Sequence, residues 1–248
     1  MMKSFVALAM ASVAAARSIT VYNGCPFTVW PAYFTSSGGN PSQPTGWQAD
    51  AFTKVTFDVP THWDGRIWAR RNCNFSGNNG PTSCLDGGCN GGLQCDRSTG
   101  TATPLPPASL AEFNFDAATN TDWYDISFVD GYNLPISVTN NVGCPSPDCA
   151  VDLGPNCPSD LKGPFDSSGF PVGCKSACYA TSLTGWVDNN PNCCTGSFGT
   201  PQTSRTTGTS NACPNAYAYA YDESSDSALW TCAGSKQASY TVTFCPPS

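Results

Sequence analysis

The sequence predicts a mainly β protein, a sandwich stapled by disulfides, and three observations carry this prediction. The 248 residues include 23 glycines and 21 prolines, which is typical of a chain with many turns and few long helices. Short runs of alternating apolar and polar residues recur, as expected for half-buried strands. The 15 cysteines indicate a disulfide framework if the protein leaves the cell.

The first 17 residues read as a secretory signal peptide. Lys3 gives a positive start, residues 5–16 form an apolar run, and three alanines end it at Ala16. Cleavage near Ala16 or Arg17 would start the mature chain around Arg17 or Ser18. The run is too short to span a membrane, and no later stretch approaches the roughly 20 apolar residues that a span requires. We therefore expect a secreted protein, extracellular or in a cell wall, with no transmembrane segment.

The expected strands follow one another in short steps separated by turn residues. In chain order they are Ile19–Tyr22, Phe27–Trp30, Val55–Val59, Arg66–Arg70, Leu110–Phe115, Trp123–Val129, Leu134–Thr139, Ala216–Tyr221 and Ser239–Phe244.

Two segments break the strand pattern. Residues 71–103 hold four cysteines and residues 151–213 hold six, with little apolar periodicity in either. We expect one domain over residues 18–248, with a β core from residues 18–70, 104–150 and 214–248. The segments 71–103 and 151–213 are then two cystine-rich insertions of loops and short helices.

Charge and composition exclude several classes of function. The formal net charge is −7, which disfavours nucleic acids and anionic membranes as partners. The single histidine, His62, precedes a Trp-Asp-Gly turn without a nucleophile motif nearby, so a Ser-His-Asp triad is not expected. One histidine and no CxxC pair also argue against zinc, and no phosphate-binding glycine motif follows a strand. We expect no metal and no cofactor.

Several motifs resemble, in order and over nearly the whole mature chain, those of the thaumatin-like protein family, in its long, pathogenesis-related-5 form. They are Asn23–Trp30 (NGCPFTVW), Gly65–Arg70 (GRIWAR), Leu110–Phe113 (LAEF), Tyr124–Ser127 (YDIS), Val129–Pro135 (VDGYNLP), Cys193–Cys194, Cys213–Tyr217 (CPNAY) and Val242–Pro246 (VTFCP). The resemblance implies a thaumatin-like β-sandwich. The stretch Gly80–Cys89 departs from the family pattern, because it lacks the usual Thr and Asp before its cysteine.

The resemblance also implies a disulfide pairing, which sequence alone could not select. The implied bridges are Cys25–Cys245, Cys73–Cys84, Cys89–Cys95, Cys144–Cys232, Cys149–Cys213, Cys157–Cys174 and Cys178–Cys193. Long family members have sixteen cysteines, whereas the partner expected for Cys194, near Ser197 or Phe198, is missing here. We expect Cys194 to be buried outside the seven bridges, with a looser loop after it.

In the family, an acidic cleft between the β core and the cystine-rich insertion is lined by one arginine and four acids. Each of these positions is matched, by Arg66, Glu112, Asp125, Asp130 and Asp222. Hydrolysis of a glycosidic bond uses two carboxyl groups, one as proton donor and the other as nucleophile or base. We expect Glu112 to be the donor and Asp130 the nucleophile or water-activating base.

The resemblance implies β-1,3-glucan as the partner, and hydrolysis would make the protein a candidate endo-β-1,3-glucanase. Two other functions stay open: a non-catalytic glucan-binding or antifungal defence protein, and an inhibitor of secreted hydrolases. The charges could also form a solvated ion-pair network that only joins parts of the fold.

Further features of the sequence bear on the site and the surface. Five aromatic residues flank the cleft residues in sequence and could either stack on sugar rings or belong to the core. They are Trp123, Tyr124, Tyr132, Tyr217 and Tyr221. Asn74 begins an N-glycosylation sequon, Asn-Phe-Ser, and we expect a monomer.

Overall fold

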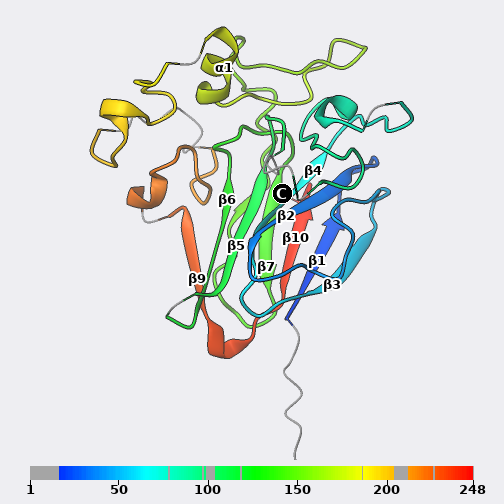
Figure 1. Ribbon diagram of the computed structural model, residues 1–248, viewed down its shortest axis with the longest axis vertical. Coiled ribbons are helices and arrows are strands. Elements are labelled where there is room, and N and C mark those ends of the chain that lie inside the picture. Colours follow the sequence, from blue (N-terminus) through cyan, green and yellow to red (C-terminus); the bar gives the residue numbers. More distant parts are fainter. Residues whose placement is uncertain are drawn as a thin grey trace, which may run out of the picture.

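The computed structural model describes residues 17–247 apart from 78, 97, 99–103, 118, 186, 204–211 and 226. Two five-stranded sheets form a sandwich (Figure 1). The first sheet consists, in spatial order, of β3 (Lys54–Val59), β1 (Arg17–Asn23), β10 (Tyr240–Phe244), β7 (Ile136–Asn140) and β8 (Asp148–Cys149). The second consists of β2 (Trp30–Ser37), β4 (Asp64–Arg70), β5 (Leu110–Ala117), β6 (Thr121–Ser127) and β9 (Leu229–Ala233). The prediction of a mainly β sandwich is confirmed.

The core lies between the sheets because apolar residues alternate with polar ones along each strand. The inward-facing residues that fill this core include Ile19, Val21, Val242, Phe244, Ile67, Phe113 and Ile126. The intervening residues of β4, β5 and β6 point to the outer face of the second sheet. That alternation directs three charged side chains, those of Arg66, Glu112 and Asp125, away from the core.

Two segments differ from the expected strands. In the stretch Phe27–Trp30, only Trp30 belongs to a strand, as the first residue of β2. Residues 216–221 form turns and lead into a short 3₁₀ helix, η3 (Asp222–Ser225), although tyrosine and alanine alternate there. Tyr217 forms a single bridge to Ser127, and then the Asp222 carboxylate accepts a hydrogen bond from the Ala218 amide at 2.9 Å, which turns the chain back.

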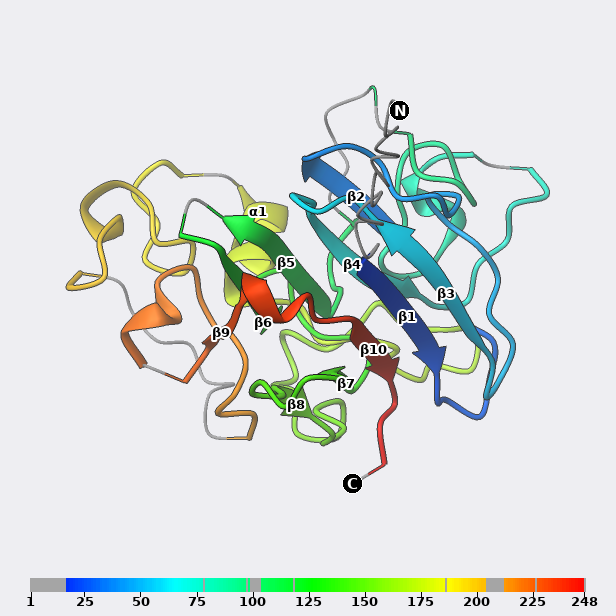
Figure 2. The ribbon, with the colours of Figure 1, turned by 90° about the horizontal axis from the view of Figure 1, so that it is seen from below.

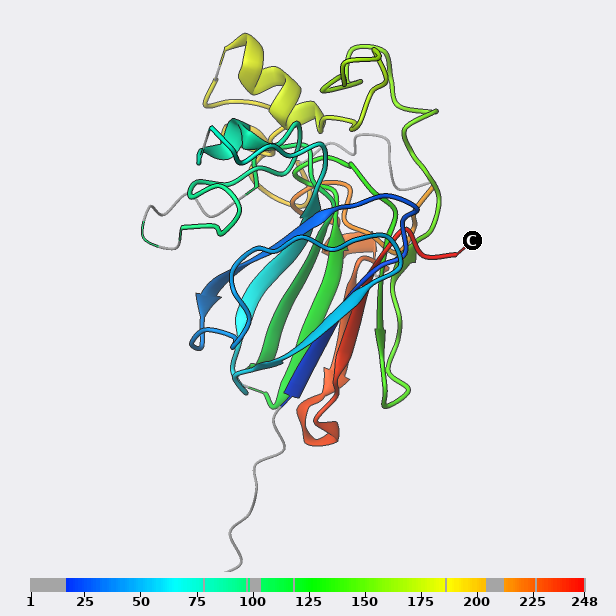
Figure 3. The ribbon, with the colours of Figure 1, turned by 90° about the vertical axis from the view of Figure 1, so that its right-hand side faces the viewer.

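The two cystine-rich segments gather at one end of the sandwich (Figures 1 and 3), and Figure 2 shows the molecule from the opposite end. The larger one carries the helix α1 (Ala177–Thr184), whose first turn is capped by the Ser176 hydroxyl accepting from the Tyr179 amide. Three more 3₁₀ turns are η1 (Pro81–Ser83), η2 (Gly196–Phe198) and η4 (Gly234–Lys236). None of the helices in the described part is long and apolar enough to cross a membrane.

Arg70 ties the smaller insertion to the second sheet. Its guanidinium is fully buried and donates to the carbonyl oxygens of Trp30 at 2.8 Å, Gly92 at 2.6 Å and Leu93 at 2.7 Å. Burial lowers the pKa of Arg70 to about 10, so the side chain remains charged at neutral pH. One residue of β4 therefore satisfies carbonyl groups from two parts of the chain.

Seven disulfides connect the same pairs of cysteines that the resemblance implies. They are Cys25–Cys245, Cys73–Cys84, Cys89–Cys95, Cys144–Cys232, Cys149–Cys213, Cys157–Cys174 and Cys178–Cys193. Cys194 is buried and takes part in none of these bridges. The looser loop expected after Cys194 falls partly on residues 204–211, which lie outside the described residues.

The expected signal peptide also lies outside the described residues, except for its last position. Arg17 is the first residue of β1, and its buried guanidinium forms an ion pair with the buried carboxylate of Asp122. Arg17 therefore belongs to the first strand of the described structure, although the sequence placed it in the segment before the domain. Cleavage after Ala16 would keep this ion pair, whereas cleavage after Arg17 would remove it.

Candidate functional site

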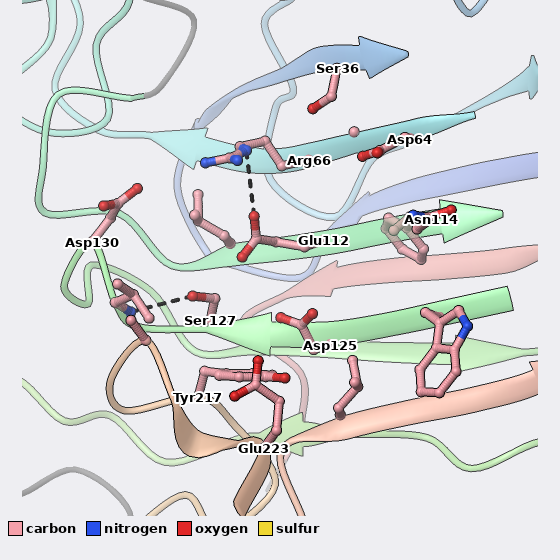
Figure 4. A pocket seen from close by; sticks show the side chains of 17 residues that line it. Ser36, Asp64, Arg66, Glu112, Asn114, Asp125, Ser127, Asp130, Tyr217 and Glu223 are labelled. Atoms are coloured by element: carbon pink, nitrogen blue, oxygen red, sulfur yellow. Dashed lines mark hydrogen bonds and ion pairs between the residues drawn. The ribbon is translucent and has the colours of Figure 1, made fainter. Parts of the chain in front are cut away.

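The outer face of the second sheet carries a cleft of about 430 Å³ with acidic walls (Figure 4). Five carboxyl groups surround one guanidinium in it. The charged lining residues are Asp64, Arg66, Glu112, Asp125, Asp130 and Glu223. Four of the five residues expected from the sequence, Arg66, Glu112, Asp125 and Asp130, thus line one cleft.

The strand register sets the order of these side chains. Arg66 of β4 lies opposite Glu112 of β5, and Glu112 lies opposite Asp125 of β6. Directly opposed residues on antiparallel strands have Cβ atoms about 4.5–5.5 Å apart, so these three side chains form one row. A second row, two residues along each strand, consists of Asp64, Asn114 and Trp123.

The wall of the cleft beside β6 comes from residues 217–223, and not from the insertion at 151–213 as expected. Tyr217, Ala220 and Glu223 line the cleft, and no described residue of 151–213 does. This wall is held against β6 by backbone hydrogen bonds, from the Tyr217 amide to the Ile126 carbonyl and from the Phe128 amide to the Tyr217 carbonyl, both 2.8 Å. The Cys149–Cys213 disulfide anchors the chain just before it.

Asp222, which was expected in the cleft, does not line it, and its neighbour Glu223 supplies the carboxyl group on this wall. The Asp222 side chain is buried and caps the Ala218 amide, whereas Glu223 is exposed and lines the cleft. Strand parity could not distinguish the two residues, since both lie in η3 and not in a strand. Asp64 was also missed, although it shares a face of β4 with Arg66 and its position is therefore readable from the alternation.

Arg66 and Glu112 form an ion pair in the centre of the cleft, with 3.4 Å between Arg66 Nε and Glu112 Oε1. Partial burial raises the pKa of Glu112, the Arg66 charge opposes this rise, and the charges of Asp130 and Asp64 add to it. Burial likewise raises the pKa of Asp130, again against the effect of Arg66. The cluster therefore contains carboxyl groups that hold protons more tightly than an exposed acid does.

Asp125 has the most strongly perturbed carboxyl group of the cleft. Burial raises its pKa well above the ordinary value, the charges of Glu112 and Glu223 raise it further, and Arg66 lowers it. Its Oδ1 atom is buried and has no hydrogen-bond partner among the described residues. A carboxyl group with a raised pKa next to one that is paired with an arginine is an environment in which the acid and base roles of catalysis can divide.

The aromatic residues divide between the cleft and the core. Trp123, which is 38% exposed, and Tyr217 line the cleft. Tyr124 and Tyr132 are buried in the sandwich core. The Tyr221 hydroxyl donates a hydrogen bond to the carbonyl oxygen of Gly199, which belongs to the larger insertion. Trp123 therefore offers a ring face at the edge of the acidic rows.

Other predicted features lie away from the cleft. Asn74 is exposed, and its Oδ1 accepts hydrogen bonds from the amide and the hydroxyl of Ser76. Across the residues that the structure describes, no three His, Cys, Asp or Glu side chains are placed to hold a metal ion.

Comparison with known proteins gives matches over most of the chain. Residues 23–246 match the model of the Thaumatin family. A pathogenesis-related thaumatin-like protein 3.5 from Cryptomeria japonica is 38% identical over 242 residues, covering 95% of this chain and 92% of the relative. A protein from Prunus avium named glucan endo-1,3-beta-glucosidase is 37% identical over 238 residues, covering 93% and 91%. The solved structure of a thaumatin-like xylanase inhibitor aligns with a TM-score of 0.45 at 17% identity, covering 92% of this chain and 99% of that one.

Proposed function

This chain belongs to the thaumatin family, and from that premise we propose that it is a secreted protein whose acidic cleft binds β-1,3-glucan and hydrolyses it. The observation that carries the proposal is the row of Arg66, Glu112 and Asp125 in an open cleft, with Asp130 and Trp123 beside it. The relative named glucan endo-1,3-beta-glucosidase supports the choice of substrate.

Binding draws on the two kinds of group that recognise a neutral polysaccharide. Carboxylates can accept hydrogen bonds from sugar hydroxyls, the Asn114 amide can both donate and accept them, and an exposed indole can stack on a pyranose ring. A neutral glucan also avoids the repulsion that an anionic polymer would meet from five carboxyl groups.

Hydrolysis requires a proton for the departing glycosidic oxygen and a carboxylate that stabilises or attacks the anomeric carbon. Glu112 and Asp130, the pair expected from the sequence, both line the cleft, and the charge of Arg66 acts to lower the pKa of each. Arg66 favours the ionised form of whichever carboxyl group lies nearest to it.

The test of this function is an assay of laminarin, a soluble β-1,3-glucan, for new reducing ends. We expect the wild-type protein to release them and Glu112→Gln to be at least about 100-fold slower, since a positioned acid or base contributes about 10²–10⁴. Asp58→Asn is the matched control, because Asp58 is an exposed aspartate on β3, outside the cleft. Equal rates for wild type and Glu112→Gln would refute the assignment of the site.

The same samples separate hydrolysis from binding alone. If the wild type releases no reducing ends but still sediments with insoluble β-1,3-glucan in a Glu112-dependent way, the protein is a non-catalytic glucan-binding protein. If it neither cleaves nor sediments with the glucan, the proposed substrate is wrong, and inhibition of another secreted hydrolase is the function to test next.

Trp123 gives a second prediction, on affinity. Trp123→Ala is expected to weaken binding to laminari-oligosaccharides about tenfold, because it removes a stacking surface at the edge of the cleft. Isothermal titration calorimetry measures this loss. The control is Phe52→Ala, which removes an aromatic ring that is 63% exposed but does not line the cleft. A loss of the same size in both variants would contradict a specific role for Trp123.

A further inference from the structure

Asp125 occupies a special position in the central row of the cleft. Glu112 lies between it and Arg66, so the guanidinium pairs with Glu112 and not with Asp125. The Oδ1 atom of Asp125 is buried without a hydrogen-bond donor among the described residues. An ionised carboxylate is unfavourable when one of its oxygens is buried and accepts no hydrogen bond, because burial removes the water that would stabilise the charge.

The polar and charged groups that line the cleft together with Asp125 come from several elements. Arg66 and Asp64 extend from β4, Glu112 from β5, and Ser127 from Asp125's own strand, β6. Asp130 follows β6, and Tyr217 and Glu223 come from the wall formed by residues 217–223. Arg66 is the one cation among these cleft-lining groups, and Glu112 stands between it and Asp125.

Two adjacent carboxyl groups do not both ionise easily, so a negative charge on either Glu112 or Asp125 favours the protonated form of the other. The ion pair with Arg66 stabilises a negative charge on Glu112. The nearby charges of Glu112 and Glu223 destabilise a negative charge on Asp125. Both effects assign the proton to Asp125.

We propose that, within the glucan cleft proposed above, Asp125 and not Glu112 holds the proton that is delivered to the glycosidic oxygen, while Arg66 keeps Glu112 ionised. This inference rests on the proposed function for the reaction, but the location of the proton is a property of the protein without substrate. It changes the role expected for Glu112 from proton donor to carboxylate.

The reaction step balances with water as the other reactant. The proton moves from Asp125 to the glycosidic oxygen as the bond from that oxygen to the anomeric carbon breaks, and the bonding electron pair goes to the oxygen. Ionised carboxylates stabilise the positive charge that develops on the anomeric carbon. A water molecule then adds its hydroxyl group to that carbon, and its remaining proton restores the Asp125 carboxylic acid.

The test is a titration of the side-chain carboxyl carbons by ¹³C NMR without substrate, with assignments made through the backbone. If the two groups titrate in two steps, we expect the chemical shift of the Asp125 carboxyl carbon to change mostly in the step at higher pH. The shift of the Glu112 carboxyl carbon should change mostly in the step at lower pH. Glu112→Gln should lower the apparent pKa of Asp125 by about one or more, since it removes a strongly interacting neighbouring charge. Asp58→Asn, on the exposed face of β3, should leave it unchanged.

The proposal is overturned if Glu112 shows the larger share of the high-pH transition, or if Glu112→Gln leaves the Asp125 titration where it was. A kinetic arm tests delivery of the proton. Asp125→Asn should lose most activity on laminarin but retain it on a laminaribioside with a dinitrophenolate leaving group, which needs no protonation. Equal losses of activity on both substrates would overturn the role of Asp125 in delivering the proton. A wild-type protein that cleaves neither substrate would refute hydrolysis, and the NMR titration would then still decide which carboxyl group holds the proton.

Discussion

Asp122→Ala is expected to lower the free energy of unfolding by about 3–5 kcal/mol, because it leaves the buried guanidinium of Arg17 without its counterion. Both side chains are almost completely buried between the sheets. The Asp122 carboxylate also accepts hydrogen bonds from the Asp116 amide at 3.0 Å and from the Tyr240 hydroxyl at 2.9 Å. One substitution therefore leaves a charge and two donors unsatisfied.

Denaturant unfolding with the disulfides intact measures this loss. Asp58→Ala serves as the control, since it removes an aspartate of the same size from an exposed position of β3. The control should change the stability by no more than about 0.5 kcal/mol. If the two variants are equally stable, Arg17 and Asp122 do not form a stabilising buried ion pair.

Asp86→Asn is expected to change how stability depends on pH. Asp86 is fully buried, and burial raises its pKa to about 7, although hydrogen bonds from the Asn133 side chain and the Arg71 amide and the charge of Arg71 oppose the rise. In the unfolded chain an aspartate has a pKa of about 3.9. Between those two values the folded protein holds a proton that the unfolded chain has released.

The sign of the effect follows from that difference in bound protons. The free energy of unfolding falls as the pH rises from about 4 to about 7, and a shift of this size corresponds to roughly 4 kcal/mol. Asp86→Asn removes this contribution, so the variant should gain stability relative to the wild type as the pH rises across that range. Unfolding curves of both proteins at pH 4.5 and pH 8 measure the change, and a constant difference between them would contradict a raised pKa in Asp86.

Strand alternation predicted most of the sandwich, whereas the family resemblance supplied the candidate residues of the cleft. Arg66, Glu112 and Asp125 are charged residues in strands whose alternate positions are apolar, and their place on the outer face agrees with that alternation. The same rule would have found Asp64. The disulfide pairs came from the family resemblance, because spacing cannot choose among the many pairings of fifteen cysteines.

The alternation of apolar and polar residues predicted the wrong structure in one segment, where tertiary contacts determine the path of the chain. The segment 216–221 alternates like a strand, but a single bridge to Ser127 and the Asp222 cap turn it into the wall of the cleft. This turn buries Asp222 and exposes Glu223. Whether Asp222 or Glu223 faces the cleft depends on that local hydrogen bond, which no sequence period encodes.

The most direct test of the account is to locate the bound glucan on the protein. Laminarihexaose added to ¹⁵N-labelled protein should shift the amide signals of Arg66, Glu112 and Asp125 and the indole signal of Trp123 more than any others. Shifts concentrated there would support the acidic cleft as the glucan site. Shifts confined to a surface outside this cleft, or none at millimolar oligosaccharide, would contradict it.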